Sequence, residues 1–162
     1  MNFKRILNSL LLISLSAGLL TTSVISVKAD TPATAASSQV QSAYAVNVKP
    51  LAVVSSPSSY LNKSVIMQAK FDKFSTLGLD YKPAFKSSTD YISFLIKRDD
   101  TTFNIPLSEM KLFIKRKTAE KFIDLKTNDE IEIKGVVFSD ALGDAWVDVN
   151  ELKITKKAPE EK

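Results

Sequence analysis

The sequence contains no cysteine and no histidine among its 162 residues. Without them the chain cannot form disulfide bonds or the zinc sites that are built from Cys and His. The same absence excludes a histidine general base, a Ser-His-Asp triad and a cysteine nucleophile. Most of the common catalytic machinery is therefore ruled out by composition alone.

The carboxylates do not pair in a way that predicts catalysis. Asp99 and Asp100 fall in a predicted tight turn, and Glu130 and Glu132 fall on the outer face of a predicted strand. A glycosidase needs two carboxylates that flank one cleft. Because no pattern brings two carboxylates together, we expect a protein that is not an enzyme and needs no cofactor.

A metal site is also not expected. Asp140, Asp144 and Asp148 recur at every fourth position, which is not the ligand spacing of a calcium loop. Turn chemistry explains Asp144 next to Gly143.

The chain begins with the pattern of a secretory signal peptide. Lys4 and Arg5 precede the apolar run Ile6–Leu20, and Val27-Lys28-Ala29 follows with small residues where signal peptidase reads. The apolar run is shorter than the roughly twenty residues that a spanning helix needs, which argues against an uncleaved anchor. We expect cleavage after Ala29 and export to the periplasm or the exterior.

Cleavage would remove most of the net positive charge. The chain has 22 basic and 18 acidic residues. Lys4, Arg5 and Lys28 leave with the signal peptide and no acidic residue does, so 19 basic and 18 acidic residues remain. A nearly neutral chain does not have the charge of a nucleic-acid-binding protein, so nucleic acid is not an expected partner.

Four regions follow from composition and hydrophobic pattern. Residues 1–29 are the signal peptide, 30–59 a flexible leader with an extended segment at Tyr44–Val54, 60–155 a β-domain and 156–162 a charged, disordered tail. Residues 55–59 are expected to form a loop, or a turn that starts a short helix at Pro57. No oligomeric state follows from these patterns.

Alternation of apolar and polar residues predicts five strands. They are placed at Ser64–Phe74, with a bend near Phe71, then at Asp90–Arg98, Thr102–Leu107, Ile131–Val137 and Trp146–Ile154. Residues Met110–Ile114 fit a helix and a strand equally well, and a helix is predicted at Ala119–Leu125. Gly135 is expected at a bend or bulge.

This order resembles the oligonucleotide/oligosaccharide-binding (OB) fold, in which a helix lies between the third and fourth strands of a five-stranded barrel. Three stretches carry the resemblance. YLNKSV at 60–65 is similar to the Y-x-G-K-x-V start of many bacterial OB domains, NDEIEIKGVV at 128–137 to their fourth strand, and AWVDVNEL at 145–152 to their fifth. Asn62 and Asn128 stand where glycine is usual, and Asn tolerates the same left-handed backbone. The resemblance implies an exported bacterial OB-fold protein, all-β with one short helix.

The aromatic and basic residues form the candidate ligand or partner surface. The loop at 75–89 contributes Tyr81 and Phe85, and it either offers these rings to a ligand or covers one end of the barrel. Trp146 is either an exposed ring on the last strand or a core residue. The full set is Tyr81, Phe85, Tyr91, Lys97, Arg98, Lys115, Arg116, Lys117 and Trp146.

The function expected from these features is a non-catalytic binding or interaction module of the cell envelope, with an envelope protein or glycan as partner. One alternative is polyanion binding, to nucleic acid or acidic glycan, through the barrel face and the run Lys115-Arg116-Lys117. Another is a structural accessory protein without a small-molecule ligand, whose segment Tyr44–Val54 docks on its own barrel or on another chain.

Overall fold

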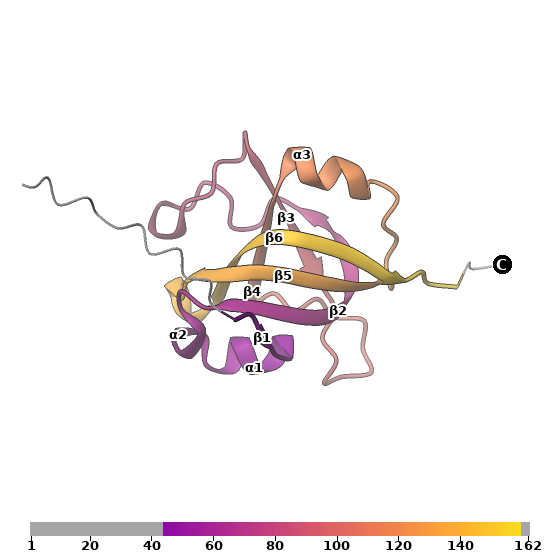
Figure 1. Ribbon diagram of the computed structural model, residues 1–162, viewed down its shortest axis with the longest axis horizontal. Coiled ribbons are helices and arrows are strands. Elements are labelled where there is room, and N and C mark those ends of the chain that lie inside the picture. The colour runs from indigo at the N-terminus through magenta and orange to yellow at the C-terminus, as the bar shows by residue number, and fades with distance from the viewer. Residues whose placement is uncertain (1–43, 160–162) are drawn as a thin grey trace, which may run out of the picture. The chain divides into compact units, whose positions relative to one another are not determined.

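Five strands close into a barrel with the order β2-β3-β4-β6-β5, in which β5 pairs back to β2 (Figure 1). A computed structural model describes residues 44–159, so the expected signal peptide lies outside the described residues. Neighbouring strands are antiparallel except β4 and β6, which are parallel. The strands are β2 (Ser64–Ser75), β3 (Tyr91–Ile96), β4 (Met110–Lys115), β5 (Glu130–Ser139) and β6 (Ala145–Lys156). This topology confirms a mostly-β, OB-like barrel.

The helix between the third and fourth barrel strands is present, as predicted. It consists of α3 (Arg116–Ala119) and a 3₁₀ turn at Glu120–Phe122. The helix begins earlier than the predicted Ala119 because β4 ends at Lys115 and the chain turns there at once. Ala119 is buried against the core, whereas Ile123, expected on the same face, is exposed.

The long strand β2 joins two parts of the barrel. Its first half pairs with β5, from Ser64 opposite Val136 to Lys70 opposite Glu130, and its second half pairs with β3. The register shifts between Phe71 and Lys73, where the strand changes partner. The predicted bend near Phe71 is confirmed, and it is what allows one strand to close the barrel.

The third barrel strand is not the predicted one. Residues 102–107 form a loop that makes one bridge, between Lys97 and Pro106, and its side chains Phe103 and Ile105 are exposed. The strand in this position is β4, where the sequence fits a helix or a strand equally well. The pattern at Phe103, Ile105 and Leu107 alternates, but only Leu107 reaches the core.

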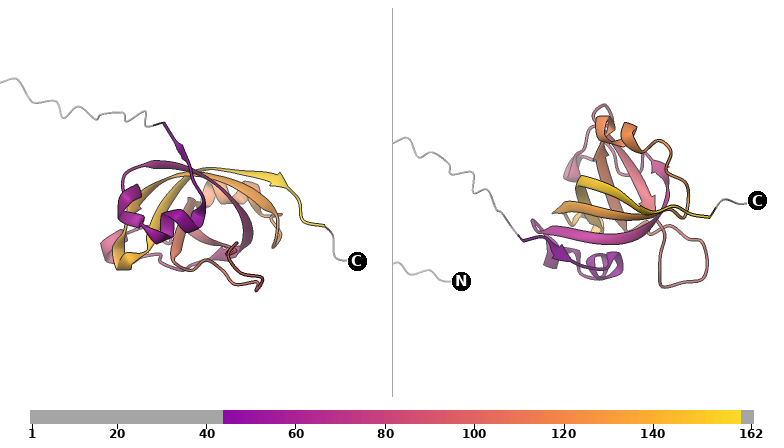
Figure 2. Two further views of the ribbon diagram at one scale, coloured as in Figure 1. Left: turned by 90° about the horizontal axis from the view of Figure 1, so that it is seen from below. Right: turned by 45° about the vertical axis from the view of Figure 1, so that its right-hand side comes forward.

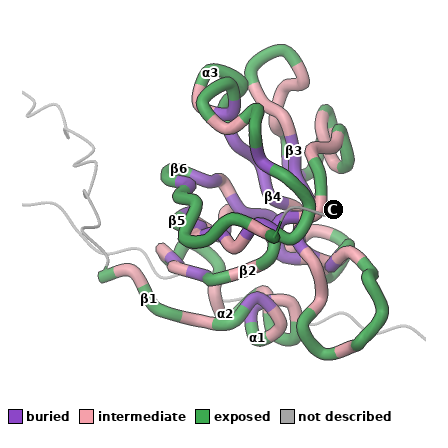
Figure 3. The backbone as a smooth tube through the Cα atoms, turned by 90° about the vertical axis from the view of Figure 1, so that its right-hand side faces the viewer, coloured by how far each residue is buried: buried purple, intermediate pink, exposed green. Residues whose placement is uncertain are grey.

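One main core fills the barrel. Burial concentrates on the barrel strands, and the connections around them are mostly exposed (Figure 3). The largest side chains with no exposed surface in this core are Phe94, Met67, Ile96, Leu107, Met110, Leu112, Ile114, Ile131 and Ile133.

The segment that precedes the barrel packs on its outside. β1 (Val46–Asn47) pairs in parallel with β2, and α1 (Pro50–Ser55) and α2 (Pro57–Tyr60) follow. Both helices lie on the side of the barrel opposite α3 (Figures 1 and 2). The extended conformation expected for Tyr44–Val54 is wrong from Pro50 on, because the chain forms α1 there. This helix buries Val53 in the core with 0% exposure. Of the two alternatives for residues 55–59, the helix that starts at Pro57 is confirmed.

Two asparagines and one glycine have the roles that the sequence predicts. Asn62 and Asn128 have φ angles of 61° and 74°, in the left-handed region where glycine is usual. The register of β5 and β6 shifts at Gly135, and a Cβ there would lie 2.5 Å from the carbonyl oxygen of Asp148. Gly135 therefore permits a close backbone approach as well as a bulge.

The C-terminal segment is partly ordered against the barrel. β6 runs to Lys156, and the ammonium of Lys157 and the backbone N–H of Ala158 both donate hydrogen bonds to Asp129. The expectation of a disordered tail from residue 156 is therefore wrong for residues 156–158, and residues 160–162 lie outside the described part.

Candidate functional site

A second, smaller cluster of apolar side chains lies on the outer face of the barrel. Phe113 and Trp146 point away from the main core because their neighbours Leu112, Ile114 and Val147 point into it. Strands two and three of the barrel carry the ligand face in OB folds that bind oligomers. Here this face includes β4 and is extended by β6, so aromatic rings stand at the expected place.

The loop between β2 and β3, residues 76–90, covers this face. The Tyr81 ring stacks on Trp146 at 5.2 Å between centroids, and Phe113 lies near-parallel to the same indole at 5.7 Å. Gly78 lies so close that a Cβ there would be 3.0 Å from Phe113 and 3.1 Å from Trp146. Trp146 is only 1% exposed, and its indole N–H donates to the carbonyl of Ala141 at 2.7 Å.

Polar contacts fasten the loop to the barrel. The Lys86 ammonium forms an ion pair with Asp148 on β6 and lies over the rings of Tyr91 and Phe138, 4.6 Å and 4.7 Å from their centroids. Arg116 donates from its side chain to the carbonyl of Ser88 at 2.8 Å. The loop therefore covers the aromatic cluster around Phe113 and Trp146.

The cover decides between the alternatives left open for the aromatic candidates. Trp146 shares the outer face with Asp148, as alternation predicts, yet it is buried, so it is a core residue and not a ligand surface. Tyr81 and Tyr91 are half-buried in the same cluster. Phe85 alone among the four is exposed, on the outer side of the loop.

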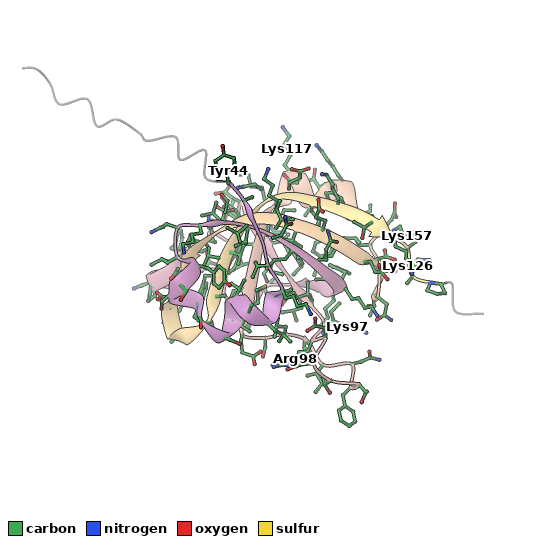
Figure 4. The ribbon with its side chains drawn as sticks, turned by 60° about the horizontal axis from the view of Figure 1, so that its bottom comes forward. Tyr44, Lys97, Arg98, Lys117, Lys126 and Lys157 are labelled. Atoms are coloured by element: carbon green, nitrogen blue, oxygen red, sulfur yellow. The ribbon has the colours of Figure 1, made fainter. Side chains whose placement is uncertain are left out.

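The two groups of basic candidates lie at opposite ends of the strand pair β3–β4. Lys115 pairs with Tyr91 at the start of β3, and Lys97 follows the end of that strand. Six residues of strand separate them by about 20 Å. The structure therefore does not combine Lys97 and Arg98 with the run Lys115-Arg116-Lys117 into one basic face (Figure 4).

Arg98 is neutralised within its own loop. Its guanidinium binds the Asp100 carboxylate through two nitrogens, at 2.9 Å and 3.0 Å, and Glu109 at 2.5 Å. The hydrogen bonds to Asp100, and then those to Glu109, raise the pKa of Arg98. Arg98 shapes the β3–β4 loop and has little capacity left for an anion.

Two adjoining grooves lie beside the β3–β4 loop, which projects from the barrel in the right-hand view of Figure 2. The first, called the loop groove, has a volume of about 470 Å³ and runs along Lys70, Asp99, Phe103 and Glu130. The second, called the lysine groove, has a volume of about 830 Å³. Its lining residues are Lys97, Asn104, Lys126, Thr127, Asn128, Ala158 and Pro159. Lys97, Asn104 and Asn128 line both, so the grooves are continuous.

The lysine groove is the feature that sequence reasoning missed. Lys126 and Asn128 follow the helix, Asn104 lies in a segment predicted as a strand, and Pro159 in a segment predicted as a disordered tail. Only Lys97 is among the predicted site residues. No local motif joins these positions, because the barrel closure brings them together.

A third, smaller cavity of about 310 Å³ lies under α3. Phe74, Ile92 and Ala119 give it apolar walls, and the exposed Ile123 stands at its edge. It has one basic and one acidic neighbour, Arg116 and Glu120. The cavity is mainly apolar and has few polar side chains to bind a ligand.

The carboxylates serve structural contacts. Burial alone would raise the pKa of Asp129, but hydrogen bonds from the N–H groups of Lys126 and Ala158 and from the Lys157 ammonium outweigh it and lower the pKa. A general acid needs the opposite shift. Glu130 and Glu132 pair with Lys156 and Lys153 between strands β5 and β6.

The three aspartates considered for a metal each have another partner. Asp140 accepts from the Ser58 hydroxyl at 2.5 Å, Asp144 pairs with Lys111 at 2.9 Å and Asp148 with Lys86. In residues 44–159, no three side chains of His, Cys, Asp or Glu gather as a metal site would require. None of the helices described is long and apolar enough to span a membrane.

No known protein family and no curated protein matches this sequence. Solved structures resemble it weakly. Asparaginyl-tRNA synthetase from Pyrococcus horikoshii is 19% identical with a TM-score of 0.47, over 68% of this chain and 23% of that one. The Entamoeba histolytica enzyme is 15% identical with a TM-score of 0.45, over 72% and 24%. OBody AM3L15 bound to hen egg-white lysozyme is 13% identical with a TM-score of 0.44, over 64% and 86%.

The chain thus spans less than a quarter of the two synthetase chains. Identities this low say nothing of a shared ligand. The class that the fold defines, an OB-like five-stranded barrel, rests on the strand order and the position of the helix in this chain.

Proposed function

We propose that this protein is a non-catalytic binding module of the cell envelope that uses the lysine groove and the loop groove. The observation that carries the proposal is the contrast between two surfaces. The aromatic face on β4 and β6 is covered by the 76–90 loop, whereas the two grooves are open and continuous. The envelope location rests on the signal peptide predicted at residues 1–29.

The lining of the grooves supports binding rather than catalysis. The buried carboxyl next to them, Asp129, is held ionised by three donors, and its lowered pKa makes it unsuited to proton transfer near neutral pH. The other polar groups are amides, hydroxyls and ammonium groups, with the Arg98 guanidinium and the Asp99 and Glu130 carboxylates in the loop groove, and they form hydrogen bonds and ion pairs with a ligand. Two continuous grooves of this kind suit a chain-like partner.

A sedimentation experiment tests the proposal. The protein from Asp30 to Lys162 is mixed with the isolated cell-envelope fraction of its own organism, and the fraction that sediments is measured. Asn104→Trp fills the shared part of the grooves without changing charge. Leu142→Trp places the same bulk on an exposed turn at the far end of β5, where it serves as the matched control.

The expected result is that wild type and Leu142→Trp sediment equally and that Asn104→Trp loses most of its binding. If the wild-type protein does not sediment, the binding-module proposal fails. If both variants sediment like wild type, the ligand binds elsewhere.

A structural accessory protein without a small-molecule ligand is the second candidate. The covered aromatic face favours it, because the usual ligand surface of an OB barrel is closed by the protein's own loop. The burial of Val53 in the core also supports it, because the accessory hypothesis has this segment dock on its own barrel. Absence of envelope binding in the sedimentation experiment would favour this candidate.

A further inference from the structure

We propose that the lysine groove binds an acidic glycan, whose anionic groups contact Lys97 and Lys126. This inference rests on the proposed function and assigns a ligand class to its site. It concerns a surface between the β3–β4 loop, the turn before β5 and the end of the chain, away from the aromatic face that the 76–90 loop covers.

The first step is the charge of the groove. Its lining includes two lysines and no carboxylate. The Lys97 ammonium contacts only the Asn104 side-chain oxygen, at 3.1 Å, and the Lys126 ammonium forms no ion pair with any residue of the described range 44–159. Two uncompensated positive charges at one concave surface attract an anion.

The second step is that nearby acids do not cancel this charge. The buried Asp129 is occupied by Lys157 at 3.0 Å and by two backbone N–H groups. Glu130 pairs with Lys156 at 3.4 Å. Figure 4 shows Lys97, Lys126 and Lys157 toward the same end of the molecule and Lys117 on another side. Because Asp129 and Glu130 are paired with Lys157 and Lys156, they leave the charges of Lys97 and Lys126 uncompensated.

The third step distinguishes a glycan from a nucleic acid. Asn104 and Asn128 each provide an amide that both donates and accepts, which matches sugar hydroxyls. Binding of single-stranded nucleic acid relies on several aromatic platforms for successive bases. Phe103, 73% exposed, is the one aromatic ring that lines either groove, and the aromatic cluster on β4 and β6 is covered by the 76–90 loop. One ring beside amides and lysines suits a sugar chain better than a row of bases.

The test uses defined probes with purified protein. Oligogalacturonate serves as the acidic glycan, neutral dextran of equal length as the uncharged probe and single-stranded DNA as the competing polyanion. Binding is measured by calorimetry at low and high salt. The key variant is Lys97→Gln with Lys126→Gln, and the matched control is Lys115→Gln with Lys117→Gln, which removes the same charge at the other end of the β3–β4 strand pair.

Oligogalacturonate is expected to bind more tightly than dextran and DNA, and its affinity is expected to fall as salt rises. The Lys97/Lys126 double variant should lose about tenfold in affinity, and the control should change little. Equal losses in both double variants, equal binding of dextran, or tighter binding of DNA would each overturn the inference.

The two proposals fail in different ways. If Asn104→Trp abolishes envelope sedimentation while the Lys97/Lys126 variant sediments normally, the binding module stands and the acidic ligand class falls. If the wild-type protein never sediments, the module itself falls.

Discussion

At the scale of single residues, the backbone requirements were the most predictable features. Asn62 and Asn128 replace the glycines usual in OB domains, and both occupy the left-handed region. Gly135 was expected at a bulge, and the close carbonyl of Asp148 explains why no side chain fits there. These positions are predictable because the constraint is local and acts on the residue itself.

The role of Asp129 was not predictable in the same way. The sequence shows an aspartate before a strand, and nothing local indicates that Lys157 and Ala158, almost thirty residues later, bind it. The same holds for Lys97 and Lys126 in the lysine groove. Their proximity depends on which strands pair, which a single sequence pattern does not determine.

Replacement of Asp129 by Asn should make the stability less dependent on pH. The folded state lowers the pKa of this carboxyl, so its contribution is fully present above the unfolded pKa of about 3.9 and is lost as pH falls through the folded pKa. In Asp129→Asn an NH₂ group faces an N–H donor, so unfolding at pH 7 should need about 1–3 kcal/mol less. Urea unfolding at pH 7 and at pH 3 measures both effects.

Asp124→Asn is the control, because Asp124 is an exposed aspartate near the same turn. It should unfold like wild type at both pH values. The destabilisation by Asp129→Asn should shrink from pH 7 to pH 3, and a difference that stays constant would contradict the assigned role.

At the scale of elements, hydrophobic alternation found four of the five barrel strands. It failed where two neighbouring segments alternate equally well. Residues 102–107 and Met110–Lys115 have similar patterns, and the strand is formed by the second because it can pair with both β3 and β6. Pairing partners decide between such segments, and the pattern contains no information on them.

The loop predicted at 75–89 is long and rich in aromatic residues, a composition that fits both a ligand contact and a cover. Its covering role depends on contacts between distant residues. The ion pair of Lys86 with Asp148 joins the loop to β6 across the rings of Tyr91 and Phe138. The loop is thus a packed element of the domain and is expected to behave as one.

Lys86→Met should loosen this loop. Methionine keeps the apolar stem over the rings but leaves Asp148 without its partner, at a cost of about 1–3 kcal/mol. Trp146 is the only tryptophan in the sequence and lies beneath the loop, so its fluorescence reports the cover directly. We expect a red shift of emission and faster acrylamide quenching.

Lys82→Met, at an exposed lysine of the same loop, should leave emission and quenching unchanged. If Lys86→Met also leaves them unchanged, the ion pair does not hold the cover in place.

At the scale of the whole described domain, the sequence pattern predicts the fold class. It does not predict where the folded domain begins. Four correctly predicted strands and a helix before the last two are enough to indicate the OB-like order, although the third strand is assigned to the wrong segment. The contribution of the preceding segment comes chiefly from Val53, with Leu51 and Val54 packed beside it, in a stretch that Pro50 interrupts. Such a residue adds little to any periodic signal, although it is fully buried.

Removal of residues 30–59 should therefore destabilise the barrel. A chain from Tyr60 to Lys162 loses β1, α1 and most of α2, and exposes the core surface that Val53 covers. Loss of that one buried side chain should lower the unfolding free energy by about 1.5–3 kcal/mol, before the partly buried Leu51 and Val54 are counted. The measurement is the melting temperature and the urea midpoint, relative to the chain from Asp30.

A chain from Tyr44 is the matched control, because it keeps every described residue, and it should melt with the chain from Asp30. Val53→Ala in the longer chain should reproduce part of the loss. If the chain from Tyr60 is as stable as the longer one but no longer sediments with the envelope fraction, the segment is an interaction arm. If it melts much earlier, as the burial of Val53 requires, the segment is part of the folded domain.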